Sequence, residues 1–291
     1  MTVGIERCPN CGSPDHGPAE IAGLVRCSDC STVYAESYVP HEEVFREGYL
    51  SGGTGDYGVD VSHPRFRAYL VRVGHRRCAR IERAQLTPTE SVLDVGCGSG
   101  EFLEAAVAEG WRAVGVEPLA DASAVARERG LDVVTGTIDD VDERFDAVTA
   151  FHVLEHMPNG PLFLRTLASA VRSGGVVYVE SPNWDSRLRE VTGERWMHLR
   201  AGEHLVHNTP ATLRTALEHA GLEDVRTGSV SYTDREHTLD ETMILLARPT
   251  WRPWLGRLER IGLGRVLARG AARRDARRGR GDVVWGLGRR P

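Results

Sequence analysis

Residues 92–103 read VLDVGCGSGEFL, and this stretch decides the fold of the chain. The apolar run that ends in Asp94 predicts a buried strand, and the residues behind the loop predict a helix. Between them, Gly96, Gly98 and Gly100 leave out side chains where the backbone must turn sharply and a ligand can approach it. A strand, a glycine loop and a helix in this order predict a nucleotide-cofactor site.

The loop differs from the G-x-G-x-x-G fingerprint of dinucleotide-binding proteins, because an acid stands two positions before its first glycine. The carboxylate of Asp94 would repel a pyrophosphate near the helix N-terminus, but it would not repel a cofactor with positive charge. Residues 94–103, DVGCGSGEFL, resemble motif I of class I S-adenosylmethionine (SAM) dependent methyltransferases. The resemblance implies an α/β, Rossmann-like sheet of seven strands flanked by helices over residues 88–249. The alternative is a glycine-rich turn that holds no ligand.

A second acid follows at the spacing that this fold needs. Glu117 ends a short apolar run twenty-three residues after Asp94, where a carboxylate can accept hydrogen bonds from both ribose hydroxyls. By resemblance, the segment from Thr137 to Asp139 holds the adenine. A solvated glutamate at a strand end is the alternative for Glu117. The cofactor contacts expected are Asp94, Gly96, Cys97, Gly98, Gly100, Glu117, Pro118, Thr137, Ile138, Asp139, Phe151 and His152.

Histidines gather in two later segments. The strand 145–151 is followed by HVLEH at 152–156, which resembles motif II of small-molecule methyltransferases, where the strand end faces the reactive methyl group. EHLVH at 203–207 stands just before a helix N-terminus. Because a histidine can take a proton near neutral pH, we predict a histidine general base. The candidates are His204 first, then His156, His152, His207 and Glu203; packing or capping by His152 and His156, and metal binding by His198, His204 and His207, are the alternatives.

The N-terminal residues carry two C-x2-C pairs, Cys8 with Cys11 and Cys27 with Cys30. This spacing is typical of a zinc ribbon, in which four thiolates hold one structural Zn²⁺ ion. About 40 residues cannot bury enough surface to fold alone, so metal binding would supply the folding energy. Disulfides are the competing interpretation.

The chain is therefore divided into four parts. We expect a zinc ribbon at 1–40, a helical lid or linker at 41–87 with Tyr49 and Tyr57 as candidate cover residues, the methyltransferase domain at 88–249, and a tail at 250–291. The last two strands of the sheet are expected at 224–227 and 242–247, as an antiparallel pair at its edge.

The tail differs from the body in charge. Residues 251–291 have a net charge of +9, while residues 1–250 have −14. Tryptophans and leucines alternate with arginines at helical spacing, which predicts a basic amphipathic helix. Such a helix can lie on an anionic membrane, pack on the acidic body, or bind nucleic acid.

The 291 residues contain no apolar run of the roughly 18 to 20 residues that a membrane span needs, and no signal sequence is recognisable. We expect a cytoplasmic protein with possible peripheral contact at the inner membrane face. Every basic residue is arginine, to which we assign no function.

The ribbon followed by this domain resembles bacterial methyltransferases that act on sugars and other secondary metabolites. We predict SAM-dependent O-methylation of a small molecule, a sugar or a lipid-linked glycan. The alternatives are an RNA or other nucleic-acid methyltransferase that uses the ribbon and the arginine tail, and a non-catalytic SAM-binding protein. Oligomeric state is not indicated by the sequence.

Overall fold

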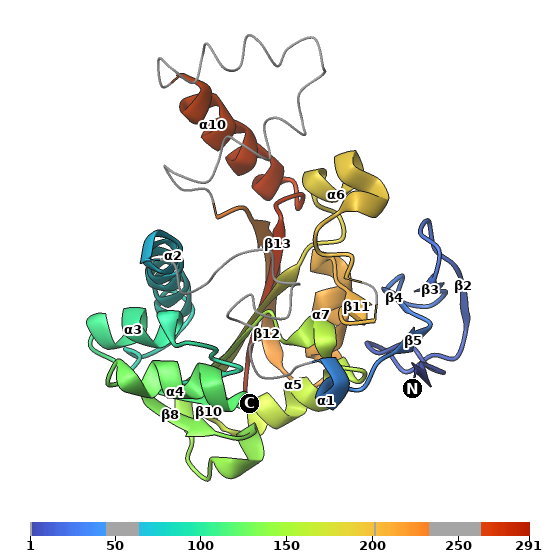
Figure 1. Ribbon diagram of the computed structural model, residues 1–291. Coiled ribbons are helices and arrows are strands. Elements are labelled where there is room, and N and C mark those ends of the chain that lie inside the picture. Colours follow the sequence, from blue (N-terminus) through green and yellow to red (C-terminus); the bar gives the residue numbers. More distant parts are fainter. Residues whose placement is uncertain (1, 45–63, 201, 233–262) are drawn as a thin grey trace.

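The computed structural model describes residues 2–44, 64–200, 202–232 and 263–291 (Figure 1). It contains a central seven-stranded sheet, a four-stranded sheet that includes most of the N-terminal strands, and a two-stranded sheet. The predicted α/β fold with seven strands is confirmed. Tyr49, Tyr57 and residues 242–247 lie outside the described residues, so the predictions about them stay predictions.

The central sheet has the strand order β12-β13-β10-β9-β6-β7-β8. Strands β10, β9, β6, β7 and β8 pair in parallel, whereas β13 is antiparallel to both of its neighbours. The strands are β6 (Ser91–Val95), β7 (Arg112–Glu117), β8 (Asp132–Thr135), β9 (Phe145–Phe151), β10 (Val171–Pro182), β12 (Glu223–Val230) and β13 (Val283–Arg289).

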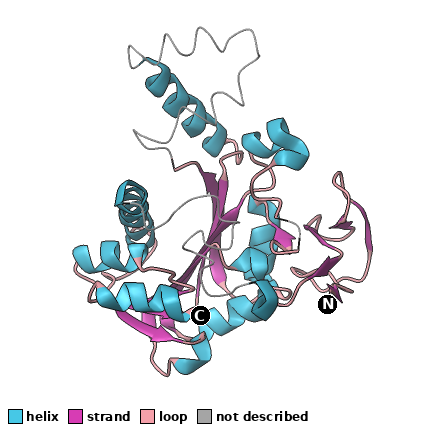
Figure 2. Cartoon of the chain, viewed as in Figure 1, coloured by secondary structure: helices cyan, strands magenta, loops and turns pink. Residues whose placement is uncertain are grey.

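Helices cover both faces of this sheet, as Figure 2 shows in cyan around the magenta strands. Successive strand residues point to opposite faces, so Leu93 packs in one core and Val92 in the other. The core with Leu93 includes side chains of α5 (Gly160–Ser169) and α7 (Pro210–His219). The core with Val92 includes side chains of α2 (Pro64–Glu82), α3 (Glu101–Ala108) and α4 (Ala120–Glu128). The remaining helices among the described residues are α1 (His41–Val44), α6 (Arg187–Thr192) and α10 (Leu263–Arg277), with short 3-10 helices η1 (Ile138–Asp140), η2 (Leu154–His156) and η3 (Gly193–Arg195).

The prediction that residues 250–291 form a tail outside the sheet is wrong for its last part. Strand β13 lies inside the sheet, between β12 and β10, and Val284 and Leu287 are buried. The segment VVWGLGR fits there because its glycines leave room for neighbouring helices: a Cβ atom at Gly286 would lie 2.6 Å from Leu217 Cδ1. The amphipathic helix predicted from residues 251–267 lies mostly outside the described residues, and the described part of this region forms α10.

We expect Gly286→Val to destabilise the protein, even though valine favours strands. The added side chain would overlap Leu213 and Leu217, and overpacking a core of this kind costs about 1–3 kcal/mol. Urea denaturation measures the loss. Gly270→Ala on α10 is the control, because a Cβ atom there meets nothing within 4 Å. Equal stability of both variants would contradict the placement of β13.

The N-terminal strands are β1 (Val3–Gly4), β2 (His16–Pro18), β3 (Leu24–Cys27), β4 (Val33–Ala35) and β5 (Ser37–Tyr38). Strands β2, β3 and β4 form an antiparallel sheet, and β1 pairs with β5. The fourth strand of the small sheet is β11 (Val206–His207), which comes from the histidine-rich segment after β10. Figure 1 shows the blue N-terminal strands beside β11 and α7.

Candidate functional site

The glycine loop joins β6 to α3 at the carboxyl edge of the sheet. Gly96, Gly98 and Gly100 have φ angles of 72°, 54° and 88°, which lie in the left-handed region that other residues avoid. Side chains also crowd the loop, since a Cβ atom at Gly96 would lie 2.6 Å from Val153 Cγ2. The glycines are therefore required by the backbone path, as their spacing predicted.

Two buried carboxylates stand at the ends of the strands beside this loop. Asp94 accepts a hydrogen bond from the Thr149 hydroxyl at 2.7 Å, and burial raises the pKa of Asp94 to about 7. Glu117 accepts hydrogen bonds from the backbone N–H groups of Gly98 and Leu119, each at 2.9 Å, and burial raises the pKa of Glu117 as well. Glu117 thus holds the glycine loop directly. A pair of buried acids suits a cofactor that carries positive charge and ribose hydroxyls.

Other predicted cofactor residues are placed in different surroundings. Cys97 is buried with its sulfur packed against β7, so only its backbone can face a ligand. Pro118 is exposed. Thr137 caps η1, and its backbone N–H donates to Asp140 at 2.8 Å, while Asp139 is exposed. Ile138 packs against the core.

Phe151 is the last residue of β9, and His152 follows it. The Phe151 ring packs edge-on against Phe102, and the Arg77 guanidinium lies 3.8 Å from its centre. His152 has a φ angle of 58°, which is strained for a residue with a side chain. Its ring nitrogen Nδ1 lies 3.2 Å from Glu155 Oε1. The strained histidine therefore stands at the strand end and is oriented by a carboxylate.

Glu155 is the centre of a histidine cluster, which consists of the buried residues Glu155, His156 and His204 and the half-buried His152 and His198. Burial by itself raises the pKa of Glu155, but the hydrogen bond with His152, followed by electrostatic attraction to His152 and His156, lowers it to about 2. Its second oxygen, Oε2, has no hydrogen-bond partner among the described residues. The carboxylate is thus charged at neutral pH and held mainly by imidazole rings.

The rings of His156 and His204 lie edge to face, 4.8 Å apart. Nδ1 of His156 lies 2.9 Å from the Glu203 carbonyl oxygen, and Nδ1 of His204 lies 2.8 Å from the His198 carbonyl oxygen. A carbonyl can only accept, so both rings carry their proton on Nδ1. Burial lowers the pKa of His204 well below its usual range, so His204 is neutral.

The side chains of the two remaining catalytic candidates make other contacts. The carboxylate of Glu203 pairs with Arg200 at 3.1 Å. His207 packs between Trp184 and Trp196, and burial lowers its pKa to about 4. Both side chains therefore contact residues of the segment that follows β10.

Sequence reasoning assigned no role to a second buried cluster, around Glu180 near the end of β10. Glu180 pairs with Phe151 in the sheet register and is fully buried. Arg77 contacts it at 2.8 Å, and the hydroxyls of Tyr178 and Tyr232 donate to it. Arg77 comes from α2 and Tyr232 follows β12, far in sequence from Tyr178 and Glu180 on β10, so no local pattern indicated the cluster. The cluster ties α2 to the strand ends beside Phe151.

The four cysteines of the N-terminal strands come together. The Sγ atoms of Cys8 and Cys30 are 3.5 Å apart, as are those of Cys11 and Cys27, and all four lie within 4.8 Å of one another. A tetrahedral ion with bonds of about 2.3 Å places its sulfur ligands about 3.8 Å apart. A disulfide would require about 2.05 Å. The four cysteines thus form one cluster whose spacing could hold a metal ion.

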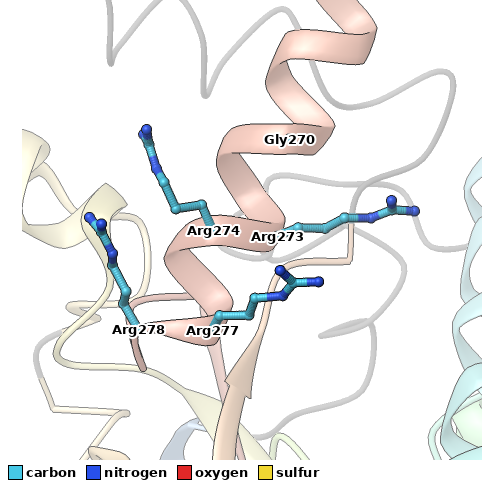
Figure 3. A pocket seen from close by; sticks show the side chains of 5 residues that line it. All are labelled: Gly270, Arg273, Arg274, Arg277 and Arg278. Atoms are coloured by element: carbon cyan, nitrogen blue, oxygen red, sulfur yellow. The ribbon is translucent and has the colours of Figure 1, made fainter.

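A separate hollow lies on α10, lined by Gly270, Arg273, Arg274, Arg277 and Arg278 (Figure 3). The figure shows the four arginine side chains spreading from the last turns of the helix. Such a surface suits an anionic partner. None of the residues predicted to be catalytic or cofactor-binding lines this hollow.

The sheet, its glycine loop and the two strand-end carboxylates define a class I SAM-dependent methyltransferase. Residues 65–227 match the family model described as "Methyltransferase domain". The chain belongs to this family.

Curated relatives carry the name "Ubiquinone biosynthesis O-methyltransferase". The protein from Methylobacterium nodulans is 32% identical over 157 residues, which cover 49% of this chain and 63% of the relative. The protein from Escherichia coli is 30% identical over 183 residues, which cover 59% of this chain and 71% of the relative. The chain thus spans about three-fifths of the first relative's length.

Among solved structures, a SAM-dependent methyltransferase from Archaeoglobus fulgidus has a TM-score of 0.51 and 22% identity, covering 77% of this chain and 94% of that one. This similarity shows the shared fold. Within the described part of the chain, no helix combines the length and apolar character that crossing a membrane requires.

Proposed function

We propose that this protein transfers the methyl group of SAM to a hydroxyl group of a small-molecule acceptor. The observation that carries the proposal is the pair formed by His152, the residue that follows the last residue of β9, and Glu155 of η2. The relatives' name, which specifies O-methyltransferases, supports a hydroxyl acceptor. An acceptor that is a sugar or a lipid-linked glycan belongs to the same proposal.

The cofactor would be held by the residues described at the carboxyl edge of the sheet. When bound, SAM supplies an electrophilic methyl group. Asp94 favours the positive charge of such a ligand, Glu117 accepts hydrogen bonds from the ribose, and the segment from Thr137 to Asp139 contacts the adenine. Glu117 already binds Gly98, so a ribose hydroxyl must share or replace that hydrogen bond.

The geometry favours His152 over His204 as the general base. The side chain of His152 is 30% exposed and can reach an acceptor, whereas His204 is only 5% exposed. Glu155 orients Nδ1 of His152 and stabilises the imidazolium that forms when Nε2 takes the acceptor proton. His156 and His204, which are buried beside Glu155, position this carboxylate. Positioning of the acceptor supplies most of the remaining rate enhancement.

The proposal is tested with purified protein, labelled SAM and a panel of catechols, phenols and sugars. We expect label in a methyl ether of at least one hydroxyl compound. Label in a carbon- or nitrogen-methylated product would overturn the hydroxyl assignment. Binding of SAM without turnover on the panel or on cell extracts would favour the non-catalytic alternative.

A second candidate is methylation of RNA, favoured by the four arginines that line the hollow on α10. Labelled SAM with total RNA provides the test. Labelled nucleosides whose yield falls in Arg273→Ala with Arg277→Ala would support it. If the same double variant instead loses binding to anionic vesicles, the arginines serve peripheral membrane contact.

We also propose that Cys8, Cys11, Cys27 and Cys30 hold one structural Zn²⁺ ion, because their sulfur atoms gather at the spacing of tetrahedral thiolates. We expect one equivalent of zinc by elemental analysis, and a loss of this zinc in Cys27→Ser with Cys30→Ser. Cys78→Ser, at a buried thiol outside the cluster, is the control. A folded, metal-free preparation would contradict the site. A second equivalent of zinc that disappears in the Glu155→Gln variant would indicate another ion, bound by Glu155, His156 and His204.

A further inference from the structure

The N-terminal strands continue into the segment that carries the buried histidines. Strand β4 pairs with β11, with Val206 opposite Tyr34 and His207 opposite Val33. The Ala35 N–H also donates to the Leu205 carbonyl at 2.9 Å. The histidine-rich segment is therefore an edge strand of the ribbon's sheet, although about 170 residues separate the two in sequence.

The two parts also share a hydrophobic core. Ile21, Leu24, Val33 and Ala35 of the ribbon pack with Trp184 and Trp196 of the segment after β10. Both tryptophans are buried. The Trp196 ring lies 5.5 Å from the His198 ring, and the carbonyl oxygen of His198 accepts a hydrogen bond from Nδ1–H of His204. Packing of the ribbon against Trp196 thus helps to hold His198, and through it His204, in place.

Asn10 links the first cysteine pair to this segment. It lies between Cys8 and Cys11 and is fully buried. Its side-chain NH₂ donates to Asn208 at 2.8 Å and to the Thr32 hydroxyl at 3.1 Å. The neighbouring Pro9 carbonyl accepts from the N–H of Gly160, the first residue of α5, at 3.0 Å. The turn between Cys8 and Cys11 is thereby anchored on the methyltransferase domain.

The same segment touches the proposed acid–base pair. The Leu205 N–H donates to the Glu155 carbonyl at 2.7 Å, and His204 lies beside the Glu155 carboxylate. The glycine loop, in contrast, is held by Glu117 and by Arg129, which donates to the Ser99 carbonyl at 2.9 Å. The N-terminal ribbon thus supports Glu155 through the segment that contains Leu205. The glycine loop is supported separately, by residues at the ends of β7 and α4.

We propose that the four-cysteine ribbon positions the acceptor side of the active site, through β4 and Asn10, so that loss of its metal uncouples methyl transfer from SAM binding. Asn10 is a positioning residue, because it acts on the reaction only through Asn208 and the segment that carries His204. The expected effect on methyl transfer rests on the function proposed above. The expected ordering of the segment that contains His204 and Leu205 does not depend on that function.

The test uses the full chain. We compare wild type, wild type treated with a zinc chelator, Asn10→Ala, and Glu20→Gln as the control on the exposed surface of the ribbon. Four quantities are measured: zinc content, SAM affinity, kcat with the acceptor that the labelling experiment identifies, and hydrogen exchange of the Leu205 amide.

We expect Asn10→Ala to keep its zinc and bind SAM within about two-fold of wild type, because the cofactor contacts are untouched. Its kcat should fall about 10- to 100-fold, since small displacements of catalytic groups have effects of this size. The Leu205 amide should exchange faster. Chelation should produce the same pattern more strongly, and Glu20→Gln should behave as wild type.

Unchanged Leu205 exchange in both Asn10→Ala and the chelated protein would overturn the inference. If SAM binding were lost when zinc is removed, the inference would also be overturned. The cofactor side of the site would then depend on the ribbon as much as the acceptor side does. If no hydroxyl acceptor is methylated, the proposed function fails, but exchange at Leu205 and SAM affinity still decide whether the ribbon orders the segment.

Discussion

Replacing His152 by asparagine is expected to lower kcat by about 10²- to 10⁴-fold, the usual contribution of a general base. Asparagine is chosen because it tolerates the left-handed backbone that residue 152 adopts, so the loop keeps its shape. SAM affinity should stay within about two-fold of wild type. Single-turnover kinetics with labelled SAM measure the transfer step directly.

Glu155→Gln should lower kcat by a similar factor, because the uncharged amide neither orients His152 as strongly nor stabilises its protonated form. Since the two residues act as a unit, the double variant should be little slower than either single variant. His75→Asn, an exposed histidine on α2, is the matched control. If His152→Asn kept full activity and His204→Asn were inactive, His204 rather than His152 would be the general base.

Asp94→Asn is expected to weaken SAM binding about 30-fold or more, corresponding to about 2 kcal/mol or more for the loss of a buried charge partner. Asparagine can still accept the hydrogen bond from Thr149, so the change removes mainly the charge. Titration calorimetry measures the affinity. Glu128→Gln, an exposed acid on α4, controls for the change in net charge.

The pKa of Asp94 adds a pH dependence to this prediction. Because the folded value is about 7, Asp94 is protonated below that pH and charged above it. SAM affinity of the wild type should therefore rise with pH through 7, and Asp94→Asn should lose this component. An unchanged affinity and pH profile in Asp94→Asn would contradict the cofactor site.

The same carboxylate should destabilise the protein when no cofactor is bound. Its folded pKa lies above the unfolded value, so its favourable contribution is present at low pH and is lost as pH rises toward 7. Asp94→Asn should thus raise the melting temperature of the cofactor-free protein near pH 8 while weakening SAM binding. Opposite effects on stability and binding distinguish a functional buried charge from a structural one.

Much of the geometry of the candidate cofactor site could be predicted because its signals are local. The left-handed glycines, the acid at the end of β6 and the acid at the end of β7 each follow from a few neighbouring residues and a regular strand-to-helix alternation. The cysteine pairs were recognisable for the same reason, since each knuckle is four residues long. The choice among the histidines could not be predicted, because exposure and the contact with Glu155 depend on the folded chain.

The sequence by itself determined the fold class, the glycine loop with its two carboxylates, and the grouping of the cysteines, because backbone torsion and periodic burial are encoded within short stretches. Only the tertiary structure decided that β13 completes the sheet, that β11 joins the ribbon, and that His152, Glu155 and His204 meet. These contacts join residues that are far apart in the chain. Their formation depends on which surfaces remain to be buried once the rest of the fold is in place, and no local pattern carries that information.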